Sequence, residues 1–156
     1  MIRCRIGESP LPTYSDQRKL PYSNENMFDL VADIERYPEF LAGWLAADIR
    51  QRDGDVLYVD QALGLGILRL RFSSRAVLRR PERIDIASTD GPFERFDINW
   101  QFEPISDLKC LLHFRLSYRL RSSLVEIVTA RFLSESARAV VTSFERRAAQ
   151  LYGSSK

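Results

Sequence analysis

A strict alternation of apolar and polar residues runs from Phe96 to Glu103, within the stretch DGPFERFDINWQFE. Successive side chains of a β-strand point to opposite faces of its sheet, so this pattern predicts a strand with one apolar, largely aromatic face. That face carries Phe96, Ile98, Trp100 and Phe102. It covers either a filled core or a cavity that holds another molecule, and the pattern alone leaves both interpretations open.

Similar runs elsewhere predict an antiparallel sheet of about seven strands. The Asp53–Gly54 pair between two of these runs is a hairpin signal, and hairpin connections favour antiparallel pairing. The expected strands cover residues 13–20, 47–52, 56–63, 67–78, 82–88, 96–103 and 109–120. Two of the longer strands are expected to turn inward Leu68, Leu70, Phe72, Ala76 and Leu78, and Cys110, Leu112, Phe114, Leu116 and Tyr118.

Two helical segments are expected after the first strand. Ser23 is a good N-cap residue for the first of them. Its apolar residues recur at helical spacing, on one stripe formed by Met27, Leu30, Val31 and Ile34. Residues 35–44 then predict a short second helical turn that is broken around Pro38 and Gly43.

The last segment, residues 124–152, has the pattern of a long amphipathic helix. A helix of this length runs about 40 Å, which is enough to cross a whole sheet. Its charged residues lie mostly opposite the apolar stripe. The stripe is expected to contain Leu133, Ala137, Val140, Val141, Phe144, Ala148 and Leu151.

The order of these elements predicts a single α+β domain over residues 13–152. One strand, two short helices, six strands and a long helix pack most simply when a curved antiparallel sheet wraps its apolar face around the terminal helix. The chain of 156 residues is long enough for one domain with its own core. Residues 1–12, which contain two prolines, are expected to form an N-terminal arm.

Composition narrows the class of protein. The formal net charge is +2, so the chain lacks the global basic signature of a DNA-binding domain, and no DNA partner is expected. Cys4 and Cys110 are too few for a disulfide framework and form no CxxC pair, so neither a metal site nor a redox site is expected. There is no secretory signal pattern and no apolar run of membrane-spanning length. A cytoplasmic location is expected, with peripheral contact at the inner membrane.

No residue pattern predicts a catalytic site. The one histidine, His113, falls on the polar face of its strand and is interpreted as a surface residue, while Cys110 is interpreted as core. The carboxylates of Asp85, Asp97 and Glu103 alternate outward, as on a solvated face. The segment LGLG lacks the lysine and the spacing of a phosphate-binding loop.

Aromatic residues are the most informative feature that remains. Each one alone is best explained by core packing, but together they are many large rings for a curved sheet covered by one helix. Such a space is easily left partly open, and an open apolar space binds apolar ligands. The residues concerned are Tyr37, Phe40, Trp44, Phe72, Phe96, Trp100, Phe102 and Phe114.

Three motifs resemble a known family. They are LPYSNENMFDLVADIERYPEFLAGW at residues 20–44, DGPF…W.F.P at residues 90–104, and F…RA..LY at residues 144–152. In this order and spacing they resemble the coenzyme Q-binding, START-like proteins of the polyketide cyclase/dehydrase (SRPBCC) superfamily. The resemblance covers residues 13–152 but departs at Ala42, where many members have proline, and near Trp44, where they commonly have cysteine.

The resemblance implies a helix-grip fold with a deep apolar tunnel and no known catalytic machinery. It implies a carrier or chaperone that supports respiratory electron transport by binding a polyprenyl quinone of the ubiquinone type, with no other cofactor. The expected ligand-binding residues are Tyr37, Phe40, Leu41, Trp44, Phe72, Phe96, Trp100, Phe114, Val140 and Phe144. Ile98 and Phe102 are expected in the same wall as Trp100, and Val141 in the opposite wall.

Two other functions follow from the same resemblance. RatA-type members are toxins that block the association of ribosomal subunits, which requires a basic surface rather than a cavity. A candidate surface is formed by Arg69, Arg71, Arg75, Arg79 and Arg80. An aromatase/cyclase enzyme is the third alternative, and it ranks last because no acid/base pair is placed in the sequence.

Overall fold

The computed structural model describes residues 11–65 and 67–153, and it contains one antiparallel sheet of seven strands. The strands are β1 (Thr13–Leu20), β2 (Trp44–Asp53), β3 (Val56–Leu65), β4 (Leu68–Arg79), β5 (Arg83–Ser88), β6 (Phe93–Ser106) and β7 (Lys109–Leu120). Their order across the sheet is β1-β7-β6-β5-β4-β3-β2. The helices are α1 (Asn24–Ala32), the 3₁₀ turn η1 (Ile34–Arg36), α2 (Tyr37–Phe40) and α3 (Ser123–Tyr152).

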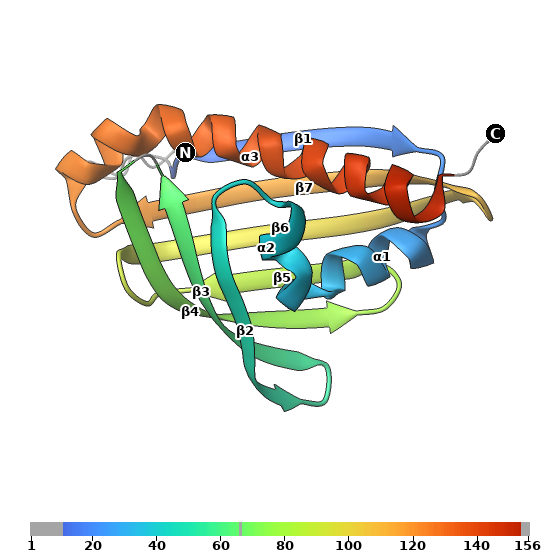
Figure 1. Cartoon of the computed structure of the whole chain (residues 1–156), viewed down its shortest axis with the longest axis horizontal. Helices are drawn as coiled ribbons and strands as arrows, with labels where there is room; N and C mark the ends of the chain where they lie inside the picture. The colour runs from blue at the N-terminus through green and yellow to red at the C-terminus, as the bar shows by residue number, and fades with distance from the viewer. Residues whose placement is uncertain (1–10, 66, 154–156) are drawn as a thin grey trace, which may run out of the picture.

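The predicted α+β helix-grip architecture is confirmed. Figure 1 shows α3 lying along the length of the curved sheet, with the α1–α2 segment beside the C-terminal half of α3. That segment connects β1 to β2, which are the two edge strands of the sheet. Most of the expected N-terminal arm, residues 1–10, lies outside the described residues.

The longest strand pair, β6 with β7, forms the floor under α3. Its register places Trp100 opposite Phe114 and Phe102 opposite Leu112, so the apolar faces of the two strands coincide. The strand predicted from residue 96 begins earlier, at Phe93, whose side chain is fully buried. The alternation of residues 96–103 therefore sets one continuous apolar wall, as predicted.

The helix α1 begins as predicted, because the Ser23 hydroxyl accepts a hydrogen bond from the Asn26 backbone N–H at 3.1 Å. The expected break at Pro38 is wrong. Proline lacks a backbone N–H, and in the first turn of a helix none is needed, so α2 begins at Tyr37 and continues through Pro38. The chain turns at Gly43, where φ is +90°, and Trp44 already belongs to β2 rather than to the helical turn.

The helix α3 buries nearly the whole predicted stripe, from Leu133 to Ala148. Leu151 is an exception: its side chain is 53% exposed, so its predicted inward position is wrong. A helical face continues four residues after Ala148, at Tyr152, whose ring packs against that of Tyr22 with the centroids 6.3 Å apart.

Replacing Trp100 with alanine is expected to cost about 3–5 kcal/mol in the free energy of unfolding, as truncation of a buried tryptophan does. Its side chain is only 2% exposed, and its ring lies 4.6 Å from that of Phe114. Urea denaturation followed by circular dichroism measures the change.

The matched control for that experiment is Asp97→Ala, on the outer face of the same strand. Asp97 forms a partly exposed ion pair with Arg95 at 2.7 Å, and its loss is expected to cost less than about 1 kcal/mol. Equal losses in the two variants would contradict the assignment of faces on β6.

Candidate functional site

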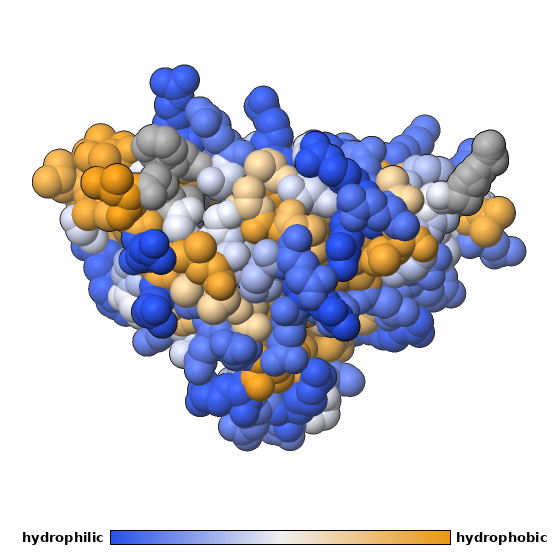
Figure 2. Space-filling view, viewed as in Figure 1, coloured by the Kyte–Doolittle hydropathy of each residue, from blue (hydrophilic) through white to orange (hydrophobic). Residues whose placement is uncertain are grey.

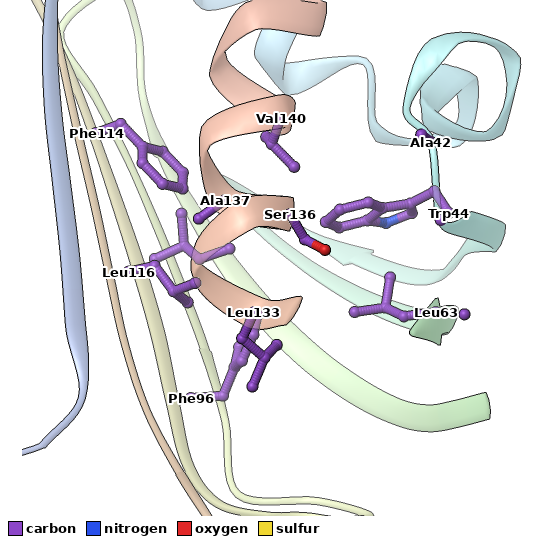
Figure 3. A pocket seen from close by; sticks show the side chains of 13 residues that line it. Ala42, Trp44, Leu63, Phe96, Phe114, Leu116, Leu133, Ser136, Ala137 and Val140 are labelled. Carbon is purple, nitrogen blue, oxygen red and sulfur yellow. The ribbon is translucent and has the colours of Figure 1, made fainter. Parts of the chain in front are cut away.

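Two apolar cavities lie between α3 and the sheet. The first, here called the outer cavity, has a volume of about 50 Å³. Figure 3 shows α3 in its centre, with Phe114 and Leu116 of β7 on one side and Trp44 and Leu63 on the other. Its walls are formed by Ala42, Gly43, Trp44, Leu63, Gly64, Phe96, Ile98, Phe114, Leu116, Leu133, Ser136, Ala137 and Val140.

The second, here called the inner cavity, lies deeper, toward α2, and has a volume of about 20 Å³. It is lined by Ile34, Tyr37, Leu41, Trp44, Gln61, Ser74, Ile86, Phe96, Ile98, Trp100, Val140 and Phe144. Four side chains line both cavities and so divide one space into two: Trp44, Phe96, Ile98 and Val140.

The deep tunnel implied by the resemblance is not open in this structure. Sites for drug-sized ligands have volumes of about 300–1,000 Å³, far above either the outer or the inner cavity. Aromatic rings fill the difference. The Phe144 ring alone makes edge contacts with Tyr37, Phe40 and Trp100, at centroid distances of 5.3, 5.2 and 5.0 Å.

Most of the predicted binding residues do lie on the cavity walls. They are Tyr37, Leu41, Trp44, Phe96, Trp100, Phe114, Val140 and Phe144, together with Ile98 from the predicted Trp100 wall. What the structure establishes is that strands β2, β6 and β7 and helices α2 and α3 bring these side chains to one place.

Four expected wall residues line neither cavity. Phe40 packs on Phe144 under the guanidinium of Arg147, which lies 5.1 Å from the Phe40 ring centre and bonds to Glu39 at 3.0 Å. Phe72 packs against Phe93 and Phe96. Phe102 meets Phe28 of α1, and Val141 is fully buried. These side chains form a layer next to the cavity walls. Protein interiors are close-packed, so this layer keeps the lining side chains in place.

Sequence reasoning missed a polar pair in the inner cavity, Gln61 and Ser74. The Trp44 indole N–H donates to Oε1 of Gln61 at 2.9 Å, and Nε2 of Gln61 donates to the Ser74 hydroxyl oxygen at 2.7 Å. The signal was present in the alternation. Gln61 follows Leu57 and Val59 on the inner face of β3, and Ser74 occupies an inward position of β4.

The ionisable candidates from the sequence lie elsewhere. His113 is on the outer face of the sheet, within 3.0 Å of Gln17 and 3.1 Å of Glu103. Burial raises the pKa of the Cys110 thiol to about 11, so this thiol stays protonated and unreactive in the core. Asp85 and Asp97 pair with Arg83 and Arg95.

Within the part of the chain that the structure describes, Tyr37 is the one phenol on the wall of either cavity. Its hydroxyl donates to the Val31 carbonyl oxygen, and burial raises its pKa far above the ordinary value. The phenol is therefore uncharged at neutral pH, and its hydrogen is used in the bond to Val31. Among the described residues, no histidine, cysteine, lysine, arginine or carboxylate lines either cavity, and no cluster of three or more potential metal ligands occurs.

Comparison with known families decides the classification. The family described as polyketide cyclase / dehydrase and lipid transport matches residues 20–145. The chain belongs to this family. Membership agrees with the curved sheet that grips α3 and with the apolar lining of the space between them.

Relatives of this chain include bacterial toxins and a coenzyme Q-binding protein. The ribosome association toxin RatA of Pseudomonas aeruginosa is 31% identical over 134 residues, which cover 86% of this chain and 93% of that protein. The mitochondrial coenzyme Q-binding protein COQ10 of Dictyostelium discoideum is 26% identical over 142 residues, which cover 88% of this chain and 69% of that protein. Neither name describes an enzyme.

The fold of this polyketide cyclase-like chain recurs in solved structures. A START superfamily protein from Mycobacterium smegmatis superposes with a TM-score of 0.78 at 17% identity, covering 89% of this chain and 98% of that one. At this level of identity the likeness concerns the fold alone.

Proposed function

We propose that this protein binds a polyprenyl quinone of the ubiquinone type in the divided cavity and acts as its carrier or chaperone for respiratory electron transport. The observation that carries the proposal is the apolar, aromatic-lined space beneath α3. The coenzyme Q-binding relative supports the choice of ligand class. Binding requires the walls to part, because the present cavities are smaller than a quinone ring with its tail.

The lining chemistry supports carrying rather than catalysis. An aromatase or cyclase moves protons, and such a step needs a positioned acid and base. The polar groups on the two cavity walls are hydroxyls, an amide and an indole N–H, of which the Tyr37 hydroxyl is engaged by the Val31 carbonyl oxygen. We therefore assign the protein a binding role and no enzymatic activity.

The variant Val140→Phe is expected to abolish quinone binding, because Val140 lines both cavities and a larger side chain fills the space between them. The control is Ala139→Phe, one residue away on the exposed side of α3. The wild-type protein and both variants are produced in quinone-rich cells, and extracted lipids are measured by mass spectrometry. Quinone absent from the wild-type protein, or retained equally in Val140→Phe, would contradict the proposal.

A membrane is the source of such a ligand, and exposed apolar side chains lie at one end of the molecule. Figure 2 shows apolar surface at the end of the molecule where α3 begins. We call this surface the rim patch, and it comprises Leu45, Ile67, Leu124, Ile127 and Val128. Within this patch, Leu45 lies against Gly64 of β3, which lines the outer cavity. None of the helices in the described residues is long and apolar enough to cross a membrane.

We expect the rim patch to insert into the surface of a bilayer, since single exposed apolar side chains gain free energy there. Ile127, whose side chain is 75% exposed, is the test position. Ile127→Glu should weaken sedimentation with vesicles of phosphatidylcholine and phosphatidylglycerol about tenfold. The control Ser134→Glu introduces the same charge at an exposed position of α3 outside the patch. Equal weakening by both variants would mean that charge alone, and not the rim patch, governs contact.

Ribosome binding is the alternative function, supported by the relative named ribosome association toxin. The candidate arginines Arg69, Arg71 and Arg75 are exposed on the outer face of β4. Acidic residues interrupt this surface, however. Asp60 accepts from the Ser73 hydroxyl at 2.6 Å, and Arg80 is paired with Asp29 at 2.8 Å. The surface is thus of mixed charge, which is why we place ribosome binding second.

On our primary proposal, added protein leaves the joining of bacterial ribosomal subunits unchanged in sucrose-gradient profiles. The wild-type protein is compared with a variant that carries both Arg71→Glu and Arg75→Glu. These substitutions reverse charge on the outer face of the sheet and change no residue of a cavity wall. If the wild-type protein depletes joined ribosomes and this variant does not, the ribosome is the target and the arginines form the contact.

A further inference from the structure

One end of the inner cavity is polar, although most of its lining is apolar or aromatic. We propose that Gln61 and Ser74 form an anchor that donates hydrogen bonds to a carbonyl oxygen on the ring of the ligand. The inference rests on the proposed function in naming a quinone as that ligand. It assigns a ligand-orienting role to residues that the aromatic pattern of the sequence does not indicate.

The orientation of the Gln61 amide is fixed by Trp44. An indole N–H can only donate a hydrogen bond, so the atom that receives it, at 2.9 Å, must be the amide oxygen of Gln61. The amide nitrogen consequently faces the other way, toward the Ser74 hydroxyl at 2.7 Å. The two residues are diagonal neighbours on β3 and β4, because Gln61 pairs with Phe72 and Val59 with Ser74.

This arrangement leaves two donors unused. The amide nitrogen carries two hydrogens and the structure uses one, toward Ser74. The Ser74 oxygen accepts that bond, and its own hydrogen has no acceptor among the described residues. Both side chains line the inner cavity and are nearly buried, at 8% and 5% exposure, so a group that enters this cavity is the acceptor within their reach.

Two unused donors in an otherwise apolar cavity favour a ligand that is mostly apolar and carries a hydrogen-bond acceptor. A ring carbonyl has two lone pairs and no hydrogen, so it can accept from Gln61 and Ser74 together. Trp100 and Phe144 line the same cavity and offer edges and faces to an aromatic or quinonoid ring. A hydrocarbon of equal size would leave the donors unpaired and should bind more weakly.

Trp44 lies between this anchor and the outer cavity. Its ring separates the inner cavity from the outer one, while its N–H holds Gln61 in position. A ligand ring that moves from the outer cavity to the anchor has to pass the four side chains that line both cavities, which are Trp44, Phe96, Ile98 and Val140. Ser74→Ala is therefore the cleaner probe, because it removes a donor and leaves the bond from Trp44 to Gln61 in place.

The test compares Ser74→Ala with Ser73→Ala, its neighbour on the outer face of β4, whose hydroxyl bonds to Asp60. Calorimetry measures affinity for three probes: a short-tailed ubiquinone, benzophenone, and diphenylmethane, which matches benzophenone without the carbonyl. Ser74→Ala should bind ubiquinone and benzophenone about five- to tenfold more weakly and diphenylmethane equally well. Ser73→Ala should match the wild-type protein for all three.

An infrared measurement separates hydrogen bonding from support of the wall. The carbonyl band of bound, ¹³C-labelled ubiquinone should lie at lower frequency in the wild-type protein than in Ser74→Ala or Gln61→Leu. An unshifted band, or equal loss of affinity for benzophenone and diphenylmethane, would overturn the anchor. If benzophenone is preferred through Ser74 while ubiquinone does not bind, the anchor stands and the proposed quinone function falls.

Discussion

The packing of this protein is determined by a mismatch in shape between the helix α3 and the strongly curved sheet. The helix α3 presents a stripe of mostly small or medium side chains, among them Ala137, Val140 and Ala148, to a broad concave surface. Such a stripe cannot fill the concavity, so large rings from β6, β7 and the α2 segment reach inward to meet it. Phe144, the one ring of the buried α3 stripe, contacts rings from the α2 segment and from Trp100 of β6, and Trp100 in turn contacts Phe114 of β7. The small cavities are the space that this packing leaves over.

The same constraint explains why α2 is part of the site. The Arg147 guanidinium lies on the Phe40 ring and bonds to Glu39, which ties the C-terminal half of α3 to a helix of four residues. That contact holds Tyr37 and Leu41 against the inner cavity. The third sequence motif, which includes Phe144 and Arg147, thus has a structural meaning: it fastens the short helix to the long one.

Most of the fold could be predicted from the sequence because its signals are local. Alternation set the strands and their inner faces, and the Ser23 cap set the start of α1. The errors have physical causes as well. Leu151 is exposed because the inward face of α3 continues from Ala148 to Tyr152, four residues on. Pro38 does not break α2 because it lies in the first turn of that helix. The volume of the cavity could not be predicted, since it depends on how rings from distant segments interlock. Gln61 and Ser74 could have been found as breaks in otherwise apolar inner faces.

One edge of the outer cavity is built by two glycines that face each other. The Gly64 backbone N–H donates to the Gly43 carbonyl oxygen at 2.7 Å, and a Cβ at Gly43 would come within 3.1 Å of the Gly64 oxygen. Both residues line the outer cavity. This edge therefore consists of two backbone segments joined by a hydrogen bond, and the side chain nearest to Gly64 is the apolar one of Leu45. On the proposed function, an edge of this kind would leave the choice of ligand to the ring that enters the cavity and would set little limit on the length of the tail that follows.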